Sequence, residues 1–444
     1  MRQSPRLLAL AALIAAVPAL APSPAAHADA PASGSFRALT YNIAGLPDGL
    51  SSAPTPRAPA TTAIGRRLGP FDIVNVQEDF NYHAYLYAAD DHAYRTPTSG
   101  GAGIGSGLNS LSHQPYSDLD RVTWKNCFIG SGDCLTPKGF TFHRVRLAEG
   151  IYLDVYNLHA DAGSTPGDEA ARRANLAQLT AYIRTHSAGS AVLVMGDTNT
   201  RYTRPGDRIA QFAADNGLTD AWVRLARGGA APAPGDPALT CPETDPGIEC
   251  EVVDKILYRG SRLLTLDAVR YANLDADFRD DDGVRLSDHF PIAADFTWTR
   301  NPDFRAGDQF GGPHGIPFTD IDRIPAGARP ATILLRAGAR VDQVGLILAD
   351  GTAFTHGGTG GTARSLTLEP DERITSVRLC RGQKNGRTRV FHIRFTTDRG
   401  RTLEGGTDTG DCVTRTTPPG WRLAGFHGRS GDEVDKLGLL YTRG

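Results

Sequence analysis

The sequence predicts a layered α/β domain followed by an all-β domain. Over residues 36–298, short apolar runs rich in β-branched residues alternate with helical stretches, a pattern typical of layered α/β folds. From Gly307 onward the helical periodicity vanishes, and short strand-like runs such as ITSVRLC and VFHIRFTT recur between turns. We therefore place the boundary between the two domains in a linker at residues 299–306.

The first 28 residues are typical of a secretory signal peptide. Arg2 and Arg6 precede the apolar run LLALAALIAAVPALA, and residues 26–28 (Ala-His-Ala) fit a small-x-small cleavage site. A membrane anchor is the alternative, but the run is short and no second such run follows it. We therefore expect a secreted, extracellular chain with no integral membrane segment after cleavage.

The charge balance argues against a strongly basic protein. The chain has 47 Lys and Arg residues against 49 Asp and Glu residues, a net charge of -2. No global basic field of the kind that marks many nucleic-acid-binding proteins is present, although a local patch would suffice for binding.

Six cysteines in an exported chain favour disulfides over metal thiolates. The sequence has no CxxC motif and no Cys/His spacing typical of zinc sites. Short loops favour local pairing, although free buried thiols remain an alternative. The predicted pairs are Cys127 with Cys134, Cys241 with Cys250, and Cys380 with Cys412.

The clearest helix begins near Thr165. Thr165 can cap the helix, Pro166 suits its first position, and acidic residues fill the first turn. Apolar residues then recur on one helical face, and Gly189 is the predicted stop. The helix joins two strand-like runs, which supports the layered α/β pattern.

Five apolar runs of the first domain end in polar residues. Loops that leave the same end of stacked strands can converge on one rim. Carboxylates, carboxamides and histidines gathered there can hold a hard cation, activate water and stabilise a phosphate. Taken singly, each motif also fits a loop acid, an Asx turn or a core histidine. The polar residues are Asn42, Glu78, His159, Asp197 with Asn199, and Asp288 with His289.

These motifs resemble, in their order, those of the endonuclease/exonuclease/phosphatase superfamily, and the resemblance covers residues 36–298. It implies a four-layer α/β sandwich with the catalytic site at one sheet rim. It also implies that Glu78, with Asn42 beside it, binds Mg²⁺ or a similar ion such as Mn²⁺ or Co²⁺. Such ions are often held by one or two carboxylates plus waters and substrate oxygens.

The same resemblance implies catalytic roles for the remaining motif residues. An aspartate partner fixes the tautomer of a histidine base, which titrates near working pH. Asp197 and Asn199 would position the water and the phosphate. His289, in the Ser-Asp-His motif with Asp288, would be the general base or its close partner, and Asp254 in EVVDKILYRG would orient it. His159 would contact the phosphate or the leaving group.

The segment WKNCFIGSGDCLTPKGFTFHRVRL is similar to a segment of secreted bacterial sphingomyelinases, including Lys138-Gly139-Phe140 before a strand. The chain departs from those enzymes before its Ser-Asp-His motif, where they place an aromatic, membrane-dipping hairpin. Here that region is acidic, with Asp280, Asp281 and Asp282. These charges repel anionic bilayers and nucleic-acid backbones alike. The loop could bind Ca²⁺, and a solvated acidic loop is the alternative.

Residues 307–442 resemble jacalin-related lectins in FGGPHGIPFTD, VDQVGLILADG, HGGTGGTARSLTL and GFHGRSGDEVDKLGLLY. The resemblance implies an all-β prism of three Greek-key sheets with a sugar site at a GxxxD loop, here Gly431 to Asp435. Asp435 then accepts hydrogen bonds from sugar hydroxyls, the backbone N–H groups of Asp432 and Glu433 donate, and Gly315 completes the site. A lectin fold retained without sugar binding is the alternative.

Together these features predict a secreted, metal-dependent phosphoric diester hydrolase. Its lectin domain would tether it to cell-surface glycans, with peripheral membrane contact. Phospholipid head groups of the sphingomyelin type are the favoured substrate over nucleic acid. The alternatives are an extracellular nuclease of the same superfamily and a glycan-binding effector with a silent catalytic domain.

Overall fold

The computed structural model describes residues 31–100 and 104–444, so the predicted signal peptide lies outside the described residues. Residues Ala32–Gly444 form one compact unit. Within the described part of the chain, no helix has the length and apolar character needed to cross a membrane.

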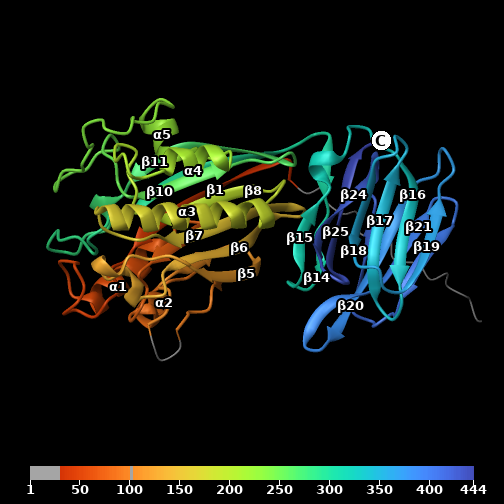
Figure 1. Cartoon of the computed structure of the whole chain (residues 1–444), viewed down its shortest axis with the longest axis horizontal. Coiled ribbons are helices and arrows are strands. Elements are labelled where there is room, and N and C mark those ends of the chain that lie inside the picture. The colour runs from red at the N-terminus through yellow and green to blue at the C-terminus, as the bar shows by residue number, and fades with distance from the viewer. Residues whose placement is uncertain (1–30, 101–103) are drawn as a thin grey trace, which may run out of the picture. The chain divides into compact units, whose positions relative to one another are not determined.

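Two six-stranded sheets form the centre of the N-terminal half (Figure 1). The first runs in the order β11 (Leu264–Asn273), β12 (Ile292–Arg300), β1 (Ser33–Asn42), β2 (Ile73–Gln77), β4 (Asn109–Ser112) and β3 (Tyr94–Arg95). The second runs in the order β5 (Tyr116–Thr123), β6 (Gly139–Ala148), β7 (Ile151–His159), β8 (Ala191–Asp197), β10 (Asp254–Arg259) and β9 (Thr219–Asp220). The pairs β1–β2 and β7–β8 are parallel, and β2 and β8 are buried along their whole length. Burial on both faces explains their continuous apolar runs.

Helices cover the outer faces of the two sheets. Ile64 and Leu68 of α1 (Arg57–Leu68) share a core with Leu86 of α2 (His83–Ala89) and with residues of β1 and β2. On the other side, α3 (Pro166–His186) lies over β7 and β8 (Figure 1), and α4 (Ile209–Asp215) joins the same core. A short helix, α5 (Ala221–Ala226), follows β9. The resulting four layers confirm the predicted α/β sandwich.

Helix α3 shows how local sequence sets an element. Thr165 accepts a hydrogen bond from the backbone N of Asp168 (3.4 Å), and the Asp168 carboxylate accepts one from the backbone N of Thr165 (2.8 Å). This reciprocal capping satisfies donors that the first helical turn leaves unpaired. The helix ends at His186, three residues before the predicted stop, because Ser187 already closes its last turn onto Ile183.

Three sheets surround one apolar core in the C-terminal half and confirm the predicted all-β prism. The first comprises β13 (Phe304–Ala306), β25 (Val434–Arg443), β24 (Trp421–Ser430) and β15 (Ile316–Thr319), with β14 (Phe310–Gly311) on β25. The second comprises β18 (Ala353–Gly357), β17 (Val341–Leu348), β16 (Pro330–Ala337) and β19 (Thr362–Thr367). The third comprises β22 (Thr402–Gly406), β21 (Arg387–Thr397), β20 (Ile374–Lys384) and β23 (Cys412–Thr416).

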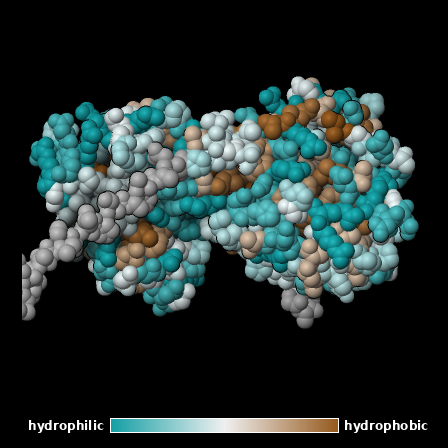
Figure 2. All heavy atoms as spheres, turned by 180° about the vertical axis from the view of Figure 1, so that it is seen from behind, coloured by the Kyte–Doolittle hydropathy of each residue, from teal (hydrophilic) through white to brown (hydrophobic). Residues whose placement is uncertain are grey.

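The chain passes from the sandwich to the prism between Arg300 and Phe304, so parts of the expected 299–306 linker are strand. Strand β12 ends at Arg300, and β13 already pairs with β25 from Phe304. Two ion pairs also connect the sheet systems within the compact unit: Arg146 with Asp308 (2.7 Å) and Lys436 with Asp118 (2.5 Å). The face of the molecule seen in Figure 2 is mostly hydrophilic, as expected when the apolar residues fill the cores.

All six cysteines are paired, as predicted from their spacing. The pair Cys380–Cys412 joins residues that lie directly opposite each other on β20 and β23. The other two disulfides close short surface loops, 127–134 and 241–250.

Candidate functional site

Strand register brings the predicted catalytic residues to one rim. The parallel pairing of β1 and β2 places Asn42 opposite Gln77, directly before Glu78. In the second sheet, His159 lies opposite Asp197 across β7 and β8, and Asp197 lies opposite Asp254 across β8 and β10. Backbone hydrogen bonding alone therefore fixes which strand ends meet.

The chain turns sharply where it leaves these strands. Ala44, Glu78 and Asn199 have φ angles of 49°, 57° and 52°, in the left-handed region that non-glycine residues rarely adopt. Such positions cost about 1–3 kcal/mol each and cluster at functional sites. Gly45 allows the tight approach, because its N donates to the Glu78 carbonyl (2.9 Å) and a Cβ there would lie 2.3 Å from that oxygen.

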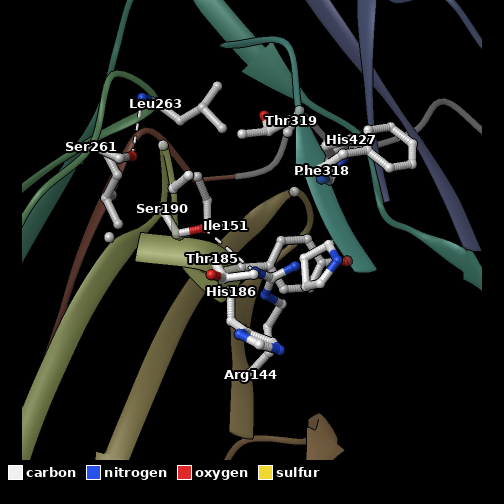
Figure 3. A pocket seen from close by; sticks show the side chains of 18 residues that line it. Arg144, Ile151, Thr185, His186, Ser190, Ser261, Leu263, Phe318, Thr319 and His427 are labelled. Atoms are coloured by element: carbon white, nitrogen blue, oxygen red, sulfur yellow. Dashed lines mark hydrogen bonds between the residues drawn. The ribbon is translucent and has the colours of Figure 1, made fainter. Parts of the chain in front are cut away.

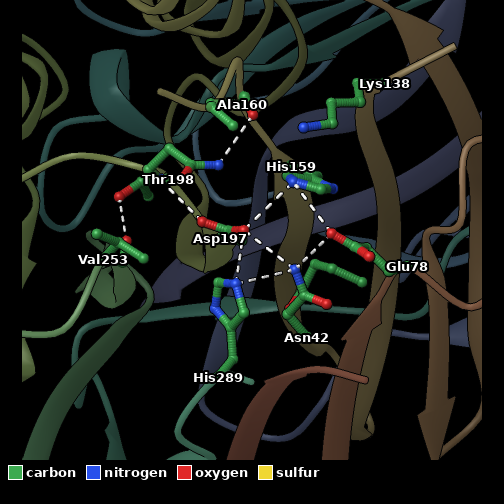
Figure 4. A network of polar contacts seen from close by, with 12 residues as sticks. Asn42, Glu78, Lys138, His159, Ala160, Asp197, Thr198, Val253 and His289 are labelled. Carbon is green, nitrogen blue, oxygen red and sulfur yellow. Dashed lines mark hydrogen bonds and ion pairs between the residues drawn. The ribbon is translucent and has the colours of Figure 1, made fainter. Parts of the chain in front are cut away.

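Asn42 is the hub of the site (Figure 4). Its Nδ2 lies 3.1 Å from Glu78 Oε1 and 3.1 Å from Asp197 Oδ2, and 3.4 Å from His289 Nε2. Its amide oxygen accepts a hydrogen bond from the backbone N of Ala44 (3.0 Å). The amide nitrogen therefore faces the carboxylates and orients Glu78, and the role of Asn42 as a metal ligand stays a prediction.

Asp254 and His289 form the predicted pair. His289 Nδ1 lies 3.0 Å from Asp254 Oδ2, and the Asp254 side chain is buried. This contact fixes a hydrogen on Nδ1 and leaves Nε2 directed toward Asp197 Oδ2, 3.7 Å away. Burial opposes charging of this imidazole, but the carboxylates of Asp254 and Asp197 outweigh it and raise the pKa of His289 well above its usual value.

The pKa of His159 is shifted in the opposite direction, downward. Its Nε2 lies 3.2 Å from Asp197 Oδ2 and 3.9 Å from Glu78 Oε1, and its side chain is almost fully buried. Burial, reinforced by the positive charge of Lys138 and of His289, holds the pKa of His159 well below its usual value. Two neighbouring histidines whose pKa values are pushed apart are an arrangement suited to acid–base chemistry.

Asp197 connects the two histidines. Burial raises its pKa to about 6, His289 opposes this shift, and the nearby charge of Asp254 adds to it. Its Oδ1 accepts a hydrogen bond from the backbone N of Asn199 (2.9 Å), and the Asn199 side chain donates to the Ala160 carbonyl (3.2 Å). The predicted pair of Asp197 and Asn199 therefore lies at the rim beside both histidines.

Asp288 stays outside the cluster. Its side chain is exposed, and its Oδ1 contacts the hydroxyl of Ser287 (3.3 Å). Ser287 also donates to the Asn42 carbonyl (2.7 Å), which ties the Ser-Asp-His loop to β1. The chain bends at residues 286–289, which leaves Asp288 exposed while His289 faces the site.

Two residues of the site had no predicted role. Lys138 is ion-paired with Asp133, and Figure 4 shows its ammonium directed toward the cluster. Arg57 is fully buried and donates to the carbonyls of Ile43, Ala44 and Leu286 at 2.8–3.0 Å. Arg57 thereby fixes the loop after β1 against the segment before His289. The Lys-Gly-Phe pattern marked Lys138 in the sequence, whereas nothing distinguished Arg57 from a surface arginine at a helix start.

The residues present fit a divalent cation. The Glu78 side chain is 23% exposed, and no lysine or arginine forms an ion pair with it among the described residues. Asp197, Asp254 and His289 also offer ligand atoms within 4.8 Å of one another. An oxygen-rich donor set of this kind suits a hard ion such as Mg²⁺.

Two carboxylates of the acidic region before the Ser-Asp-His motif, Asp275 and Asp280, have partners within the chain. Asp275 is ion-paired with both Arg279 and Arg285. Asp280 accepts hydrogen bonds from the backbone N of Asp282 (3.1 Å) and of Val284 (2.7 Å). The carboxylates of Asp275 and Asp280 are therefore engaged by arginines and by the backbone, and Ca²⁺ binding by this loop stays a prediction.

A separate pocket lies away from this rim (Figure 3). Its lining includes Arg144, Tyr152, His186, Phe318 and His427 and none of the predicted catalytic residues. Burial lowers the pKa of His427 to about 4, so this imidazole is neutral at physiological pH. The pocket therefore carries no acid–base pair comparable to the rim.

The predicted lectin loops meet in the prism. The register of β15 and β24 places Ile316 opposite Ser430, so Gly315 and Gly431 flank the same end of this pair. A Cβ on Gly315 would lie 2.4 Å from Asp435 Oδ2, and the φ angle of Gly315 is 73°. Gly431 and Asp432 are exposed, whereas Asp435 is fully buried and forms an ion pair with Arg389.

Family models match both halves of the chain. Residues 61–233 match the model of endonuclease/exonuclease/phosphatase family 2, and residues 307–440 match the jacalin-like lectin domain. A sphingomyelinase of Mycobacterium tuberculosis (strain ATCC 25618 / H37Rv) is 45% identical over 271 residues, 60% of this chain and 53% of that protein. Horcolin of Hordeum vulgare is 27% identical over 130 residues, 28% of this chain and 89% of that protein. The chain thus spans about half the length of the curated sphingomyelinases that it matches.

Solved structures show likeness to each half separately. Sphingomyelinase C from Streptomyces griseocarneus has a TM-score of 0.41 at 20% identity, covering 59% of this chain and 99% of that one. A mannose-binding jacalin-related lectin from Ananas comosus has a TM-score of 0.29 at 22% identity, covering 32% of this chain and 99% of that one. The family models thus identify a domain of the endonuclease/exonuclease/phosphatase family at residues 61–233 and a jacalin-like lectin domain at residues 307–440.

Proposed function

We propose that the protein is a secreted, divalent-metal-dependent phosphodiesterase that hydrolyses phospholipid head groups of the sphingomyelin type. The observation that carries this proposal is the cluster at one rim, in which Asn42 hydrogen-bonds to Glu78 and Asp197, and His289 is ion-paired with Asp197 and Asp254. The 45% identity to a mycobacterial sphingomyelinase supports the substrate class.

Side chains of the rim would supply the base, the groups that position the water, a phosphate contact and a ligand for the cation. Asp254 holds His289 through Nδ1, so in the neutral imidazole Nε2, which faces Asp197 and Asn42, can take a proton from a water molecule positioned by Asp197 and Asn199. His159, kept neutral by burial, faces the same carboxylate and can contact a phosphate oxygen. Glu78 would hold the cation, which supplies positive charge to the phosphate as negative charge spreads over its oxygens.

Exposed apolar residues on three rim loops support a lipid substrate. Leu50 follows β1, and Ile129 and Leu135 lie between β5 and β6; they are 72%, 67% and 76% exposed. The pairing of Phe140 with Leu158 places the start of β6, and hence the loop before it, beside His159. Ile104, before β4, is 49% exposed.

Burying one such side chain in an apolar environment gains about 1.5–3 kcal/mol. A nucleic-acid site would instead present basic residues along the rim. The apolar loops therefore favour a phospholipid surface over the nuclease alternative. A jacalin-like domain would add glycan binding and raise the local concentration of the enzyme at a cell surface.

The metal-dependent step is tested with a soluble substrate. The full chain should hydrolyse bis-p-nitrophenyl phosphate with Mg²⁺, Mn²⁺ or Co²⁺, and excess EDTA should abolish turnover. His289→Ala removes the base and should lower kcat by about 10²–10⁴-fold. Unchanged turnover in EDTA or in His289→Ala contradicts the proposed site.

The lipid preference is tested on vesicles. The double variant Ile129→Ser/Leu135→Ser should lose activity on sphingomyelin vesicles and keep turnover of bis-p-nitrophenyl phosphate. Val269→Ser is the matched control, because Val269 is 55% exposed on β11, away from the rim loops. An equal loss in the control, or none in the double variant, removes this support for a lipid surface.

A further inference from the structure

The carboxylate predicted to receive sugar hydroxyls already has a cation on it. Arg389 is ion-paired through Nη1 with Oδ1 of the buried Asp435, and its Nε lies 3.1 Å from Glu433 Oε2. Hydrogen bonds between ionised groups are roughly twice as strong as those between neutral groups. A neutral sugar hydroxyl is therefore a poor competitor for the place that Arg389 holds.

Further cations surround the same loop. Glu433 accepts hydrogen bonds from Arg340 Nη2 (2.7 Å) and from Lys384 Nζ (2.7 Å). These contacts lower the pKa of Glu433 to about 2. The Glu433 carboxylate is thus shared among three cationic side chains, counting Arg389.

Two arginines at this loop have no anionic partner among the described residues. Arg387 is exposed at the start of β21, and no hydrogen bond or ion pair of its side chain occurs in the described part of the chain. Arg429 donates instead to the main-chain carbonyls of His314 (3.1 Å) and Gly315 (3.0 Å). Burial and the charges of these arginines and Arg389 lower the pKa of His314, which shows that they face the first loop.

The local charge is positive even when the exposed Asp432 is counted. Five cationic side chains face four carboxylates, an excess of one positive charge around this loop. The cations are Arg340, Lys384, Arg387, Arg389 and Arg429, and the carboxylates are Asp342, Asp432, Glu433 and Asp435.

We propose that this loop site, formed by Gly315 and Gly431–Asp435, binds sugars that carry a carboxylate, sulfate or phosphate group in preference to neutral sugars. The proposal rests on the proposed lectin function of the domain. The anionic group would pair with the guanidinium groups of Arg387 and Arg429, whose planar fork matches such oxyanions. Arg389 would then stay on Asp435, so binding breaks no existing ion pair.

Matched sugar pairs test the preference on the full chain. Calorimetric titration would compare glucose with glucuronate, galactose with galactose 6-sulfate, and mannose with mannose 6-phosphate in low-salt buffer. We expect each anionic sugar to bind about tenfold or more tightly than its neutral partner. Higher salt should weaken this difference, because exposed charges are screened.

Two arginine variants separate the site from general surface charge. Arg387→Gln should remove most of the anionic preference. Arg399→Gln should keep it, because Arg399 is also exposed but lies in the turn after β21, about 40 Å along the strand from Arg387. An equal effect of both variants, or no effect of Arg387→Gln, overturns the assignment.

The remaining outcomes distinguish this inference from the lectin function itself. Binding of neutral sugars as tightly as anionic ones overturns the inference and leaves the lectin function intact. Binding of neither kind overturns both. Binding of phosphatidylglycerol vesicles through Arg387, without binding of the anionic sugars, shows a membrane contact and also overturns the inference.

Discussion

Asp254 provides the sharpest test of the catalytic arrangement. Its Oδ2 lies 3.0 Å from His289 Nδ1 in a buried position, so Asp254→Asn keeps the shape of the side chain and removes its charge. A hydrogen bond to a charged group contributes about 1.5–3 kcal/mol, and each 1.36 kcal/mol corresponds to tenfold in rate. We therefore expect kcat to fall about 10- to 150-fold with little change in KM.

Asp288→Asn is the matched control, because it makes the same chemical change on the residue next to His289. Among the described residues the exposed Asp288 side chain hydrogen-bonds only to the hydroxyl of Ser287, and its charge raises the pKa of His289 less than the charges of Asp254 and Asp197 do. Turnover of bis-p-nitrophenyl phosphate should therefore stay within about twofold of wild type, since surface changes away from such contacts are usually nearly neutral.

The two variants are compared in one steady-state assay over a range of pH. The account is refuted if Asp254→Asn retains full turnover, or if Asp288→Asn loses as much as Asp254→Asn. A loss in Asp288→Asn alone would mean that the exposed carboxylate, rather than the buried one, governs His289.

Two further predictions concern the catalytic rim, and a third concerns Glu433 in the lectin loop. Glu78→Gln removes the exposed carboxylate of the rim and should weaken Mg²⁺ binding, measured by calorimetry, by tenfold or more; unchanged affinity places the cation elsewhere. In metal-free protein, titration followed by NMR should give His289 a pKa above 6.5 and His159 one below it, because carboxylates surround the first and burial dominates the second; coincident titration contradicts this. The pKa of Glu433 is about 2 in the folded protein and about 4.3 in the unfolded chain. The charged carboxylate therefore stabilises the folded state fully above pH 4.3, and this contribution is lost as the pH falls toward 2. The Tm difference between wild type and Glu433→Gln should shrink over that window, and a constant difference argues against the charge contact.

The sequence predicts the features that depend on short-range pattern. Thr165 and Pro166 mark the start of α3, because capping involves only neighbouring residues. The local disulfides follow from spacing for the same reason. Strand-end motifs predict the rim, because parallel pairing brings the ends of β1 and β2, and of β7 and β8, to the same edge.

The sequence pattern does not predict contacts between distant segments of the chain. Arg57 joins loops separated by more than two hundred residues, and nothing near it in the chain marks that role. The ion pair of Arg389 with Asp435 spans 46 positions and places a cation on the carboxylate that the sequence predicts as a sugar acceptor. Asp288 is adjacent to His289 in the chain, yet Asp254, 35 positions away, is the residue that contacts the imidazole.

The substrate class is the central claim, and one measurement tests it directly. The same preparation of the full chain is assayed for phosphocholine release from sphingomyelin vesicles and for cleavage of plasmid DNA, each with Mg²⁺, Mn²⁺ and Co²⁺. The account predicts that phosphocholine release exceeds DNA cleavage per enzyme and that EDTA abolishes it. Degradation of the plasmid with sphingomyelin untouched under all three metals would contradict the account and establish the nuclease alternative.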